Sequence, residues 1–294
     1  MTWILFSLLA AFLWSIVNIV DKYVMGKWIK NPTIPIIFTG IIGVIASFFV
    51  FLINGFQLLS LSLIILALIA GIFYILMTLF YLKAVQIEEI SRIIPLFYLS
   101  PIVLAIFSRI FLREILTPVQ YIGIALLIIG AILISSKKLV KITLNKAFFF
   151  MILAVLSLSI YSIILKYLLT HASFWQVFAY MQLCCFILTI PIFLFNYRDL
   201  IIAIKNHGKK IVLIMALNAL IDLSGVLAIT IATSIGYVSL VSSLASIQPF
   251  FVLLMASSLS IFYPKILKEE TQKSTIALKF IAIALMFIGA ILII

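Results

Sequence analysis

The sequence is poor in charge. Only 10% of its 294 residues are charged, Asp and Glu together number 8, and 66% of the residues are hydrophobic. A soluble domain of this length cannot carry so little charge without exposing a very large apolar surface to water. The scarcity of charge therefore excludes a soluble protein and predicts an integral membrane protein.

Residues that build most enzyme centres are also scarce. The two cysteines, Cys184 and Cys185, are adjacent in one apolar run, and we interpret them as small buried hydrophobic residues. The two histidines, His171 and His207, lie in separate predicted loops, so they do not predict a metal centre. A Gly-rich phosphate-binding loop is missing as well. We therefore expect no enzymatic activity, no metal and no cofactor, and we leave proton coupling open.

Long apolar runs fill the rest of the chain. A bilayer core of about 30 Å requires roughly 20 apolar residues in a helix. A transmembrane β-barrel requires alternating segments, and the run from Leu61 to Ile72 contains no such alternation. The predicted fold class is all-α integral membrane, with ten transmembrane helices at about 3–20, 33–53, 63–82, 90–108, 118–135, 147–165, 174–196, 211–231, 237–262 and 276–294.

One apolar phrase occurs twice. IALLIIGAILI (124–134) and the first eleven residues of IALMFIGAILII (283–294) differ at two positions only. The first predicted helix also aligns with the sixth, with Phe6, Ser15 and Lys22 matching Phe150, Ser159 and Lys166. Pro101 and Pro249 occupy similar places in the fourth and ninth. This order predicts an internal duplication of five helices: a first repeat at 1–136, a cytoplasmic linker at 137–146 and a second repeat at 147–294.

The basic residues predict an inverted arrangement of the two repeats. Five is an odd number, so the second copy must enter the membrane from the opposite side. Of the 20 Lys and Arg residues, 17 lie in the odd-numbered loops or within about one helical turn of them, so we expect these loops to be cytoplasmic, with both termini outside the plasma membrane. The net charge of +12 is explained by this orientation and by contact with anionic lipids, without nucleic acid. The sequence leaves the oligomeric state open.

Several local patterns resemble a known family. They are AVQIEEISRIIP (84–95), the helix from Pro101 to FLRE (111–114), and YIGIALLIIGAIL (121–133). Together with the ten predicted helices they resemble EamA-type members of the drug/metabolite transporter superfamily. The resemblance implies a secondary carrier, commonly an exporter, for small metabolites such as amino acids or drugs. The second half departs from the family pattern at SLSIFYPKILKEETQKST (258–275), an extended charged segment.

Two functions fit an inverted repeat. Two similar halves around one central site favour alternating access, so transport of a small-molecule substrate is the leading hypothesis. The alternative is a flippase for a lipid or a lipid-linked headgroup, which the basic loops would recruit. A soluble substrate predicts saturable uptake into vesicles, whereas a flippase predicts a change in headgroup exposure without such uptake.

Asp222 is the strongest candidate for a functional residue. It lies near the middle of the eighth predicted helix, where a carboxylate costs roughly 2.5–3.5 kcal/mol on insertion scales. Asn218, at i−4, shares its face. The pair predicts either a cation site or proton acceptor, or a structural carboxylate bonded to a neighbouring helix.

The other pathway candidates carry similar alternatives. A lysine near a helix end either reaches the interface or neutralises a substrate carboxylate. A polar residue beside a helix-breaking proline marks either a pathway or a packing kink. Asp21 has no counterpart in the second repeat, where Leu165 stands, so a duplicated ion site is not supported. The remaining candidates are Trp14, Asn18 and Lys22 in the first helix, Lys166 in the sixth, Gln182 in the seventh, Tyr98 beside Pro101 and Gln248 beside Pro249.

Overall fold

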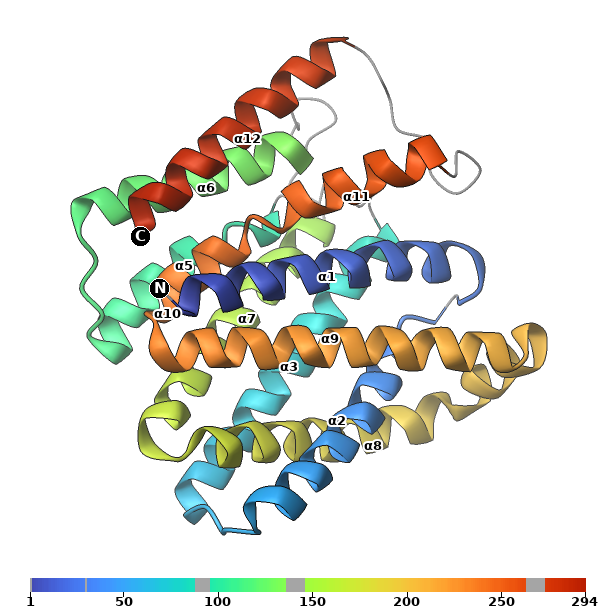
Figure 1. Cartoon of the computed structure of the whole chain (residues 1–294). Helices are drawn as coiled ribbons and strands as arrows, with labels where there is room; N and C mark the ends of the chain where they lie inside the picture. Colours follow the sequence, from blue (N-terminus) through green and yellow to red (C-terminus); the bar gives the residue numbers. More distant parts are fainter. Residues whose placement is uncertain (1, 30, 88–95, 136–145, 263–272) are drawn as a thin grey trace.

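In the computed structural model the chain is all-helical across the residues that the structure describes: 2–29, 31–87, 96–135, 146–262 and 273–294 (Figure 1). The predicted linker and most of the charged segment 258–275 lie outside these ranges. The helices are α1 (Thr2–Lys27), α2 (Thr33–Asn54), α3 (Leu61–Ile87), α5 (Ser100–Phe107), α6 (Pro118–Ser135), α7 (Lys146–His171), α8 (Phe174–His207), α9 (Lys209–Ile235), α10 (Val238–Ala245), α11 (Gln248–Phe262) and α12 (Lys273–Ile293), with a π-helical turn, η1 (Ser108–Leu112), after α5.

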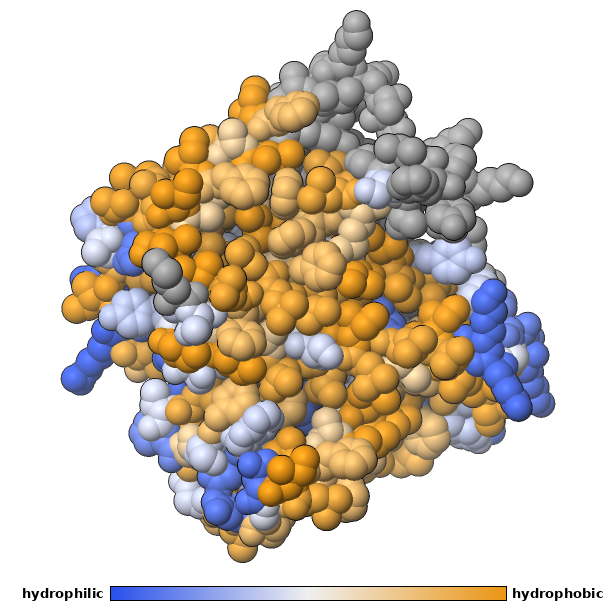
Figure 2. All heavy atoms as spheres, viewed as in Figure 1, coloured by the Kyte–Doolittle hydropathy of each residue, from blue (hydrophilic) through white to orange (hydrophobic). Residues whose placement is uncertain are grey.

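The helices are built to cross a membrane. Within the described ranges, seven stretches are long and apolar enough to span a bilayer, and three shorter apolar stretches overlap the remaining predicted spans. Figure 2 shows an apolar band across the molecule, with hydrophilic residues gathered at two opposite margins. The seven are Thr2–Asp21, Thr33–Asn54, Leu61–Ala84, Lys146–His171, Phe174–His207, Lys209–Ile235 and Val238–Met255; the shorter ones are Ser100–Leu112, Pro118–Leu133 and Phe280–Ile293.

Four helix pairs form most of the packing. They are α1 with α9, α2 with α8, α3 with α7, and α6 with α12. Every pair joins a helix that precedes residue 136 to a helix that follows residue 145. Figure 1 shows α1 and α9 side by side and both termini at the same end of the helices. The two halves of the chain therefore share one interior.

The repeated phrase forms the α6–α12 pair. A Cβ atom added to Gly289 would lie 2.7 Å from the Gly123 carbonyl oxygen and 2.8 Å from the Leu127 nitrogen. A Cβ atom added to Gly130 would lie 2.7 Å from the Ala282 carbonyl oxygen. These backbones touch, because the small residues Gly123, Gly130 and Gly289 let the two helices approach closely.

The helices are interrupted beside both prolines. Tyr98 and Leu99 form a turn before α5, and a second break separates α10 from α11. The same hydrogen bond, from a backbone N–H to the carbonyl three residues earlier, occurs at both breaks. Leu99 N donates to Leu96 O at 3.1 Å, and Ile247 N donates to Leu244 O at 3.1 Å. Pro101 and Pro249 have no N–H, so each lies where the regular helical ladder has already been broken.

The α6–α12 contact predicts a sharp difference between two glycine substitutions. Gly289→Ala forces a methyl group against backbone atoms, so we expect it to lower the free energy of unfolding by about 1–3 kcal/mol. Gly71→Ala is the control, because its Cβ would come closest to the end of the flexible Leu188 side chain, at 3.0 Å, and would lie at ordinary contact distance, 3.6 Å, from Cys184. Thermal unfolding of the purified variants in detergent measures the difference. Equal melting temperatures would show that the close contact does not exist.

Candidate functional site

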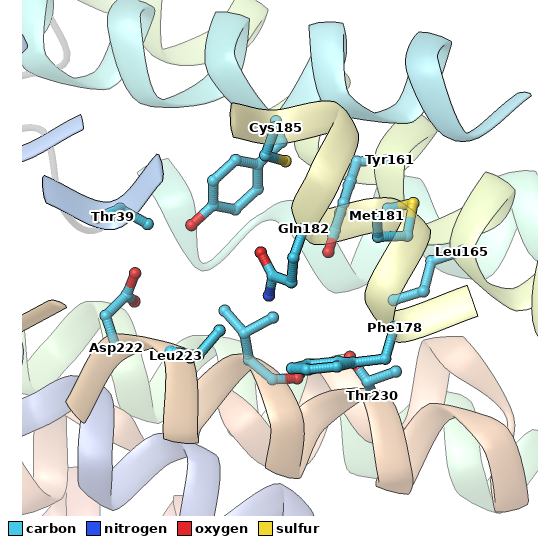
Figure 3. A pocket seen from close by; sticks show the side chains of 12 residues that line it. Thr39, Tyr161, Leu165, Phe178, Met181, Gln182, Cys185, Asp222, Leu223 and Thr230 are labelled. Atoms are coloured by element: carbon cyan, nitrogen blue, oxygen red, sulfur yellow. Dashed lines mark hydrogen bonds between the residues drawn. The ribbon is translucent and has the colours of Figure 1, made fainter. Parts of the chain in front are cut away.

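A narrow pocket lies in the interior, between α2, α3, α7, α8 and α9. The free space inside it is small, with room for about one water molecule. Three of its wall residues, Tyr74, Tyr161 and Asp222, lie near the middle of their spanning helices. Figure 3 shows the side chains that line it. These are Thr39, Tyr74, Tyr161, Leu165, Phe178, Met181, Gln182, Cys185, Asp222, Leu223, Val226 and Thr230.

Gln182 brings an unsatisfied amide into this pocket. Its side chain is only 7% exposed, and within the described part of the chain no hydrogen bond engages the amide. Figure 3 shows it between Asp222 and Tyr161, pointing into the cavity. A buried polar group without a partner costs about 1–3 kcal/mol, and such groups are rare in native structures. The amide is therefore a group that a bound molecule or water would satisfy.

Asp222 faces the pocket with one oxygen already bonded. Trp14 Nε1, on α1, donates a hydrogen bond of 3.1 Å to Asp222 Oδ1. Gly225 makes room for this indole, since a Cβ there would lie 2.7 Å from Trp14 Nε1. Oδ2 of Asp222 has no hydrogen bond to any described residue. The predicted residues Trp14 and Asp222 thus meet across α1 and α9, and one carboxylate oxygen stays available.

A second carboxylate stands behind the first. Asn218 Nδ2 donates a hydrogen bond of 2.7 Å to Asp21 Oδ1, which again joins α9 to α1. Asn218 is 5% exposed, and its own Oδ1 is buried without a partner in the described structure. Asp21 is close enough to Asp222 for the two carboxylates to interact electrostatically.

Asp21 was not predicted as a site residue. The sequence analysis sought a matching acidic residue in the second repeat and found Leu165 instead. A usable signal was present, because Asp21 follows Trp14 by seven residues, two helical turns, and so shares its face of α1. Tyr74 was missed as well: it lines the pocket from α3, and its ring centroid lies 5.3 Å from that of Tyr161. An aromatic residue in an apolar helix carries no such signal.

Other predicted pathway residues lie away from the pocket. Asn18 is half-buried on α1, and Gln248 is half-buried at the start of α11. Tyr98 is 7% exposed and belongs to a hydrophobic cluster with residues of α6 and α10. These three do not line the pocket. The side chain of Lys22 lies outside the described part of the structure.

Lys166 stabilises a turn instead of lining the pocket. Its Nζ donates hydrogen bonds of 2.7 Å to Thr233 O and 2.8 Å to Gly236 O, at the end of α9. Across the same turn, Glu114 accepts a 2.9 Å bond from Val238 N and a 3.1 Å bond from the Ser239 hydroxyl, at the start of α10. A cation at a helix C-terminus and an anion at a helix N-terminus both oppose the helix dipoles. We call this group the α9–α10 clasp.

Glu114 was not predicted either. It is the second residue after η1, and it follows Arg113, whose φ of 57° is in the left-handed region. The side chain is 5% exposed. A carboxylate in a loop between two predicted spans gives no sign from sequence that it will be buried against another helix.

Comparisons with known proteins agree with this architecture. The sequence pattern of the EamA-like transporter family matches residues 1–136. An uncharacterised protein of Methanocaldococcus jannaschii is 30% identical over 135 residues, which are 46% of this chain and 96% of that protein. The chain belongs to the EamA-like transporter family. It is accordingly a multi-pass membrane transporter of small solutes.

A solved structure shares the overall fold of this chain. A protein crystal structure superposes with a TM-score of 0.73 at 17% sequence identity, and the match covers 99% of this chain and 98% of that one. At this identity the similarity establishes the fold alone. The fold shared with the solved structure therefore covers nearly the whole chain, including the half that the family pattern does not match.

The α9–α10 clasp predicts a structural role for Lys166. Lys166→Met removes a charged donor from two carbonyl groups, so we expect the free energy of unfolding to fall by about 1.5–3 kcal/mol. Lys205→Met, at an exposed site on α8, is the control and should have little effect. Thermal unfolding in detergent tests both variants. A Lys166→Met protein that keeps its melting temperature would return Lys166 to the list of pathway residues.

Proposed function

We propose that the protein is a secondary carrier that moves a small metabolite by alternating access, and that the pocket is its substrate site. The observation that carries this proposal is the pair of unsatisfied polar groups, the Gln182 amide and the Asp222 oxygen, in one cavity at mid-membrane depth. A membrane interior tolerates such groups mainly where they face protein or water. The family membership favours solute transport over the flippase alternative.

The proposed architecture is ten helices in two inverted repeats of five, at 1–136 and 147–294. The contacts between α6 and α12 support it because they are reciprocal. The repeated phrase aligns Gly130 with Gly289 and Gly123 with Ala282, and the close contacts join Gly123 to Gly289 and Gly130 to Ala282. Exchanging the two copies leaves this pair of contacts unchanged, as a two-fold axis requires.

The residues of the pocket also support a two-fold relation between the two repeats. Helices α3 and α9 are both 27 residues long. The register that aligns Leu61 with Lys209 also aligns Pro101 with Pro249, and Tyr74 with Asp222. Tyr74 and Asp222 both line the pocket. The relative of about half this chain's length further supports a five-helix unit as the building block.

Alternating access requires an opening at each end of the pocket in turn. The α9–α10 clasp lies toward the end where both termini lie, which the charge bias assigns to the outside of the plasma membrane (Figure 1). The Asp21–Asn218 bond lies nearer the opposite end. We propose that these two contacts hold the two gates. Export is the direction that the family resemblance favours.

Cys185 provides a native reporter for this proposal. It lines the pocket, whereas the other cysteine, Cys184, is 2% exposed and packs in a hydrophobic cluster. In a Cys184→Ser protein reconstituted in vesicles, we expect a membrane-impermeant thiol reagent to modify Cys185 from either side, since each side gains access in turn. Cys185→Ser is the control and should stay unmodified. Access from neither side would refute both the pocket and the carrier.

We further propose that Asp222 is the proton acceptor that couples transport to a pH gradient. The described titratable groups around it are Asp21 on α1, Tyr74 on α3, Tyr161 on α7 and Cys185 on α8. Of the two carboxylates, Asp222 is the one that lines the cavity. A proton on Asp222 removes its charge and so changes which state of the carrier is favoured.

Asp222→Asn should abolish pH-driven accumulation of the transported solute while the protein still inserts and folds. The solute is first selected by its effect on the melting temperature, from amino acids, polyamines, nucleotides, sugars and lipid headgroups. Asp199→Asn, at an exposed carboxylate of α8, is the matched control and should transport normally. Unchanged pH-driven accumulation in Asp222→Asn would remove Asp222 from the coupling mechanism.

A further inference from the structure

We propose that the substrate is a small organic cation, a molecule with a protonated amine and a neutral hydrogen-bonding group, and not an amino acid or an anion. This inference rests on the proposed function, because it takes the pocket to be the substrate site. It adds a chemical class that the family membership does not supply.

The charged groups at the pocket are the first evidence for a cationic substrate. Asp222 presents a carboxylate oxygen without a hydrogen bond in the described structure, and the Asp21 carboxyl group on α1 is bonded to Asn218, one turn from Asp222 on α9. None of the lining residues is Lys, Arg or His. Lys166, on the same helix as the lining residue Leu165, directs its ammonium group to the α9–α10 clasp. A substrate carboxylate would thus meet the Asp222 carboxylate and, among the described lining residues, no cation.

The aromatic residues in the pocket wall are the second piece of evidence for a cationic substrate. Tyr74, Tyr161 and Phe178 surround the cavity beside Asp222. Aromatic faces attract a cation, most strongly where water is excluded. An ammonium ion that pairs with Asp222 therefore finds a favourable lining, whereas an anion finds the negative faces of aromatic rings.

Gln182 is the evidence for a neutral hydrogen-bonding group on the substrate. Its buried amide is both a donor and an acceptor, and Figure 3 shows it facing the cavity beside Asp222. A neutral hydroxyl, amide or carbonyl group on the substrate would satisfy it. Because the pocket is narrow, the substrate must be small or the walls must move apart to admit it.

The preference for cations is measurable on Cys185 without knowing the substrate. Purified Cys184→Ser protein is treated in detergent with two methanethiosulfonate reagents, one with an ethylammonium group and one with an ethylsulfonate group. Each rate is divided by the rate of the same reagent with a free thiol in solution, so the reactivity of each reagent cancels. We expect the normalised rate for the cation to exceed that for the anion by about tenfold or more.

Matched variants then locate the source of the preference. Asp222→Asn should bring the ratio of the two rates close to one, and Asp199→Asn, which removes an equal charge from the surface, should leave it unchanged. If Asp222→Asn fails to fold, Gln182→Glu tests the same point, because a further carboxylate in the pocket should raise the ratio. A ratio that does not respond to Asp222 or to residue 182 would overturn the inference.

Protection of Cys185 by ligands tests the substrate class directly. The probes are isobutylamine, valine and isobutanol, which share one carbon skeleton and differ in charge. Isobutylamine should slow the modification of Cys185 in a concentration-dependent way, and valine and isobutanol should not. Protection by valine that equals or exceeds that by the amine, or faster reaction with the anionic reagent, would overturn the cationic class while leaving an accessible pocket. Failure of both reagents to reach Cys185 would overturn the carrier proposal itself.

Discussion

The constraint on which this structure depends is the cost of a carboxylate inside a bilayer. Asp222 lies on a helix that is otherwise apolar, and water is not available there to solvate it at low cost. The protein meets this cost with Trp14, whose indole N–H reaches Asp222 from α1. One turn away, Asn218 on α9 makes the reverse contact, to Asp21 on α1. The pairing of α1 with α9 is therefore set by polar bonds as well as by apolar packing, and it fixes which face of α9 lines the pocket.

Elsewhere the helices are held by contacts of a different kind. The α6–α12 pair brings backbone against backbone at Gly123 and Gly289, and no side chain there can rearrange to let the helices slide. The α9–α10 clasp is polar and depends on two side chains, Lys166 and Glu114, that come from other elements. A close-packed pair suits a fixed scaffold, whereas a turn held by two side chains can be released by their movement. This division matches the needs of a carrier whose ends open in turn.

Much of the fold was readable from the sequence because it depends on local composition. The apolar runs predicted the spanning helices, and Pro101 and Pro249 predicted where two helices are interrupted. The repeated phrase predicted two matching helices, and in the structure these two helices pack together. Asp222 and Gln182 were identified because a polar residue within an apolar run is conspicuous. Asp21 and Glu114 were not, since each lies near the end of a predicted span, where a charge ordinarily faces water. Their burial is a product of tertiary packing, which joins segments more than 120 residues apart.

Asp21 was left out of the candidate residues because the two repeats were treated as functionally equal. Symmetry between copies is needed where the helices must exchange conformations, and the α6–α12 contacts keep it. At the pocket the copies diverge: Asp222 aligns with Tyr74, and Asp21 aligns with Leu165. Had both copies kept their carboxylates, four negative charges would share one small cavity, and their repulsion would oppose any closed state. At each of these two positions one repeat is acidic and the other is aromatic or apolar, which gives a cavity that attracts a cation and can still close around it. The residues without a counterpart are thus the ones from which the chemistry of the site is best inferred.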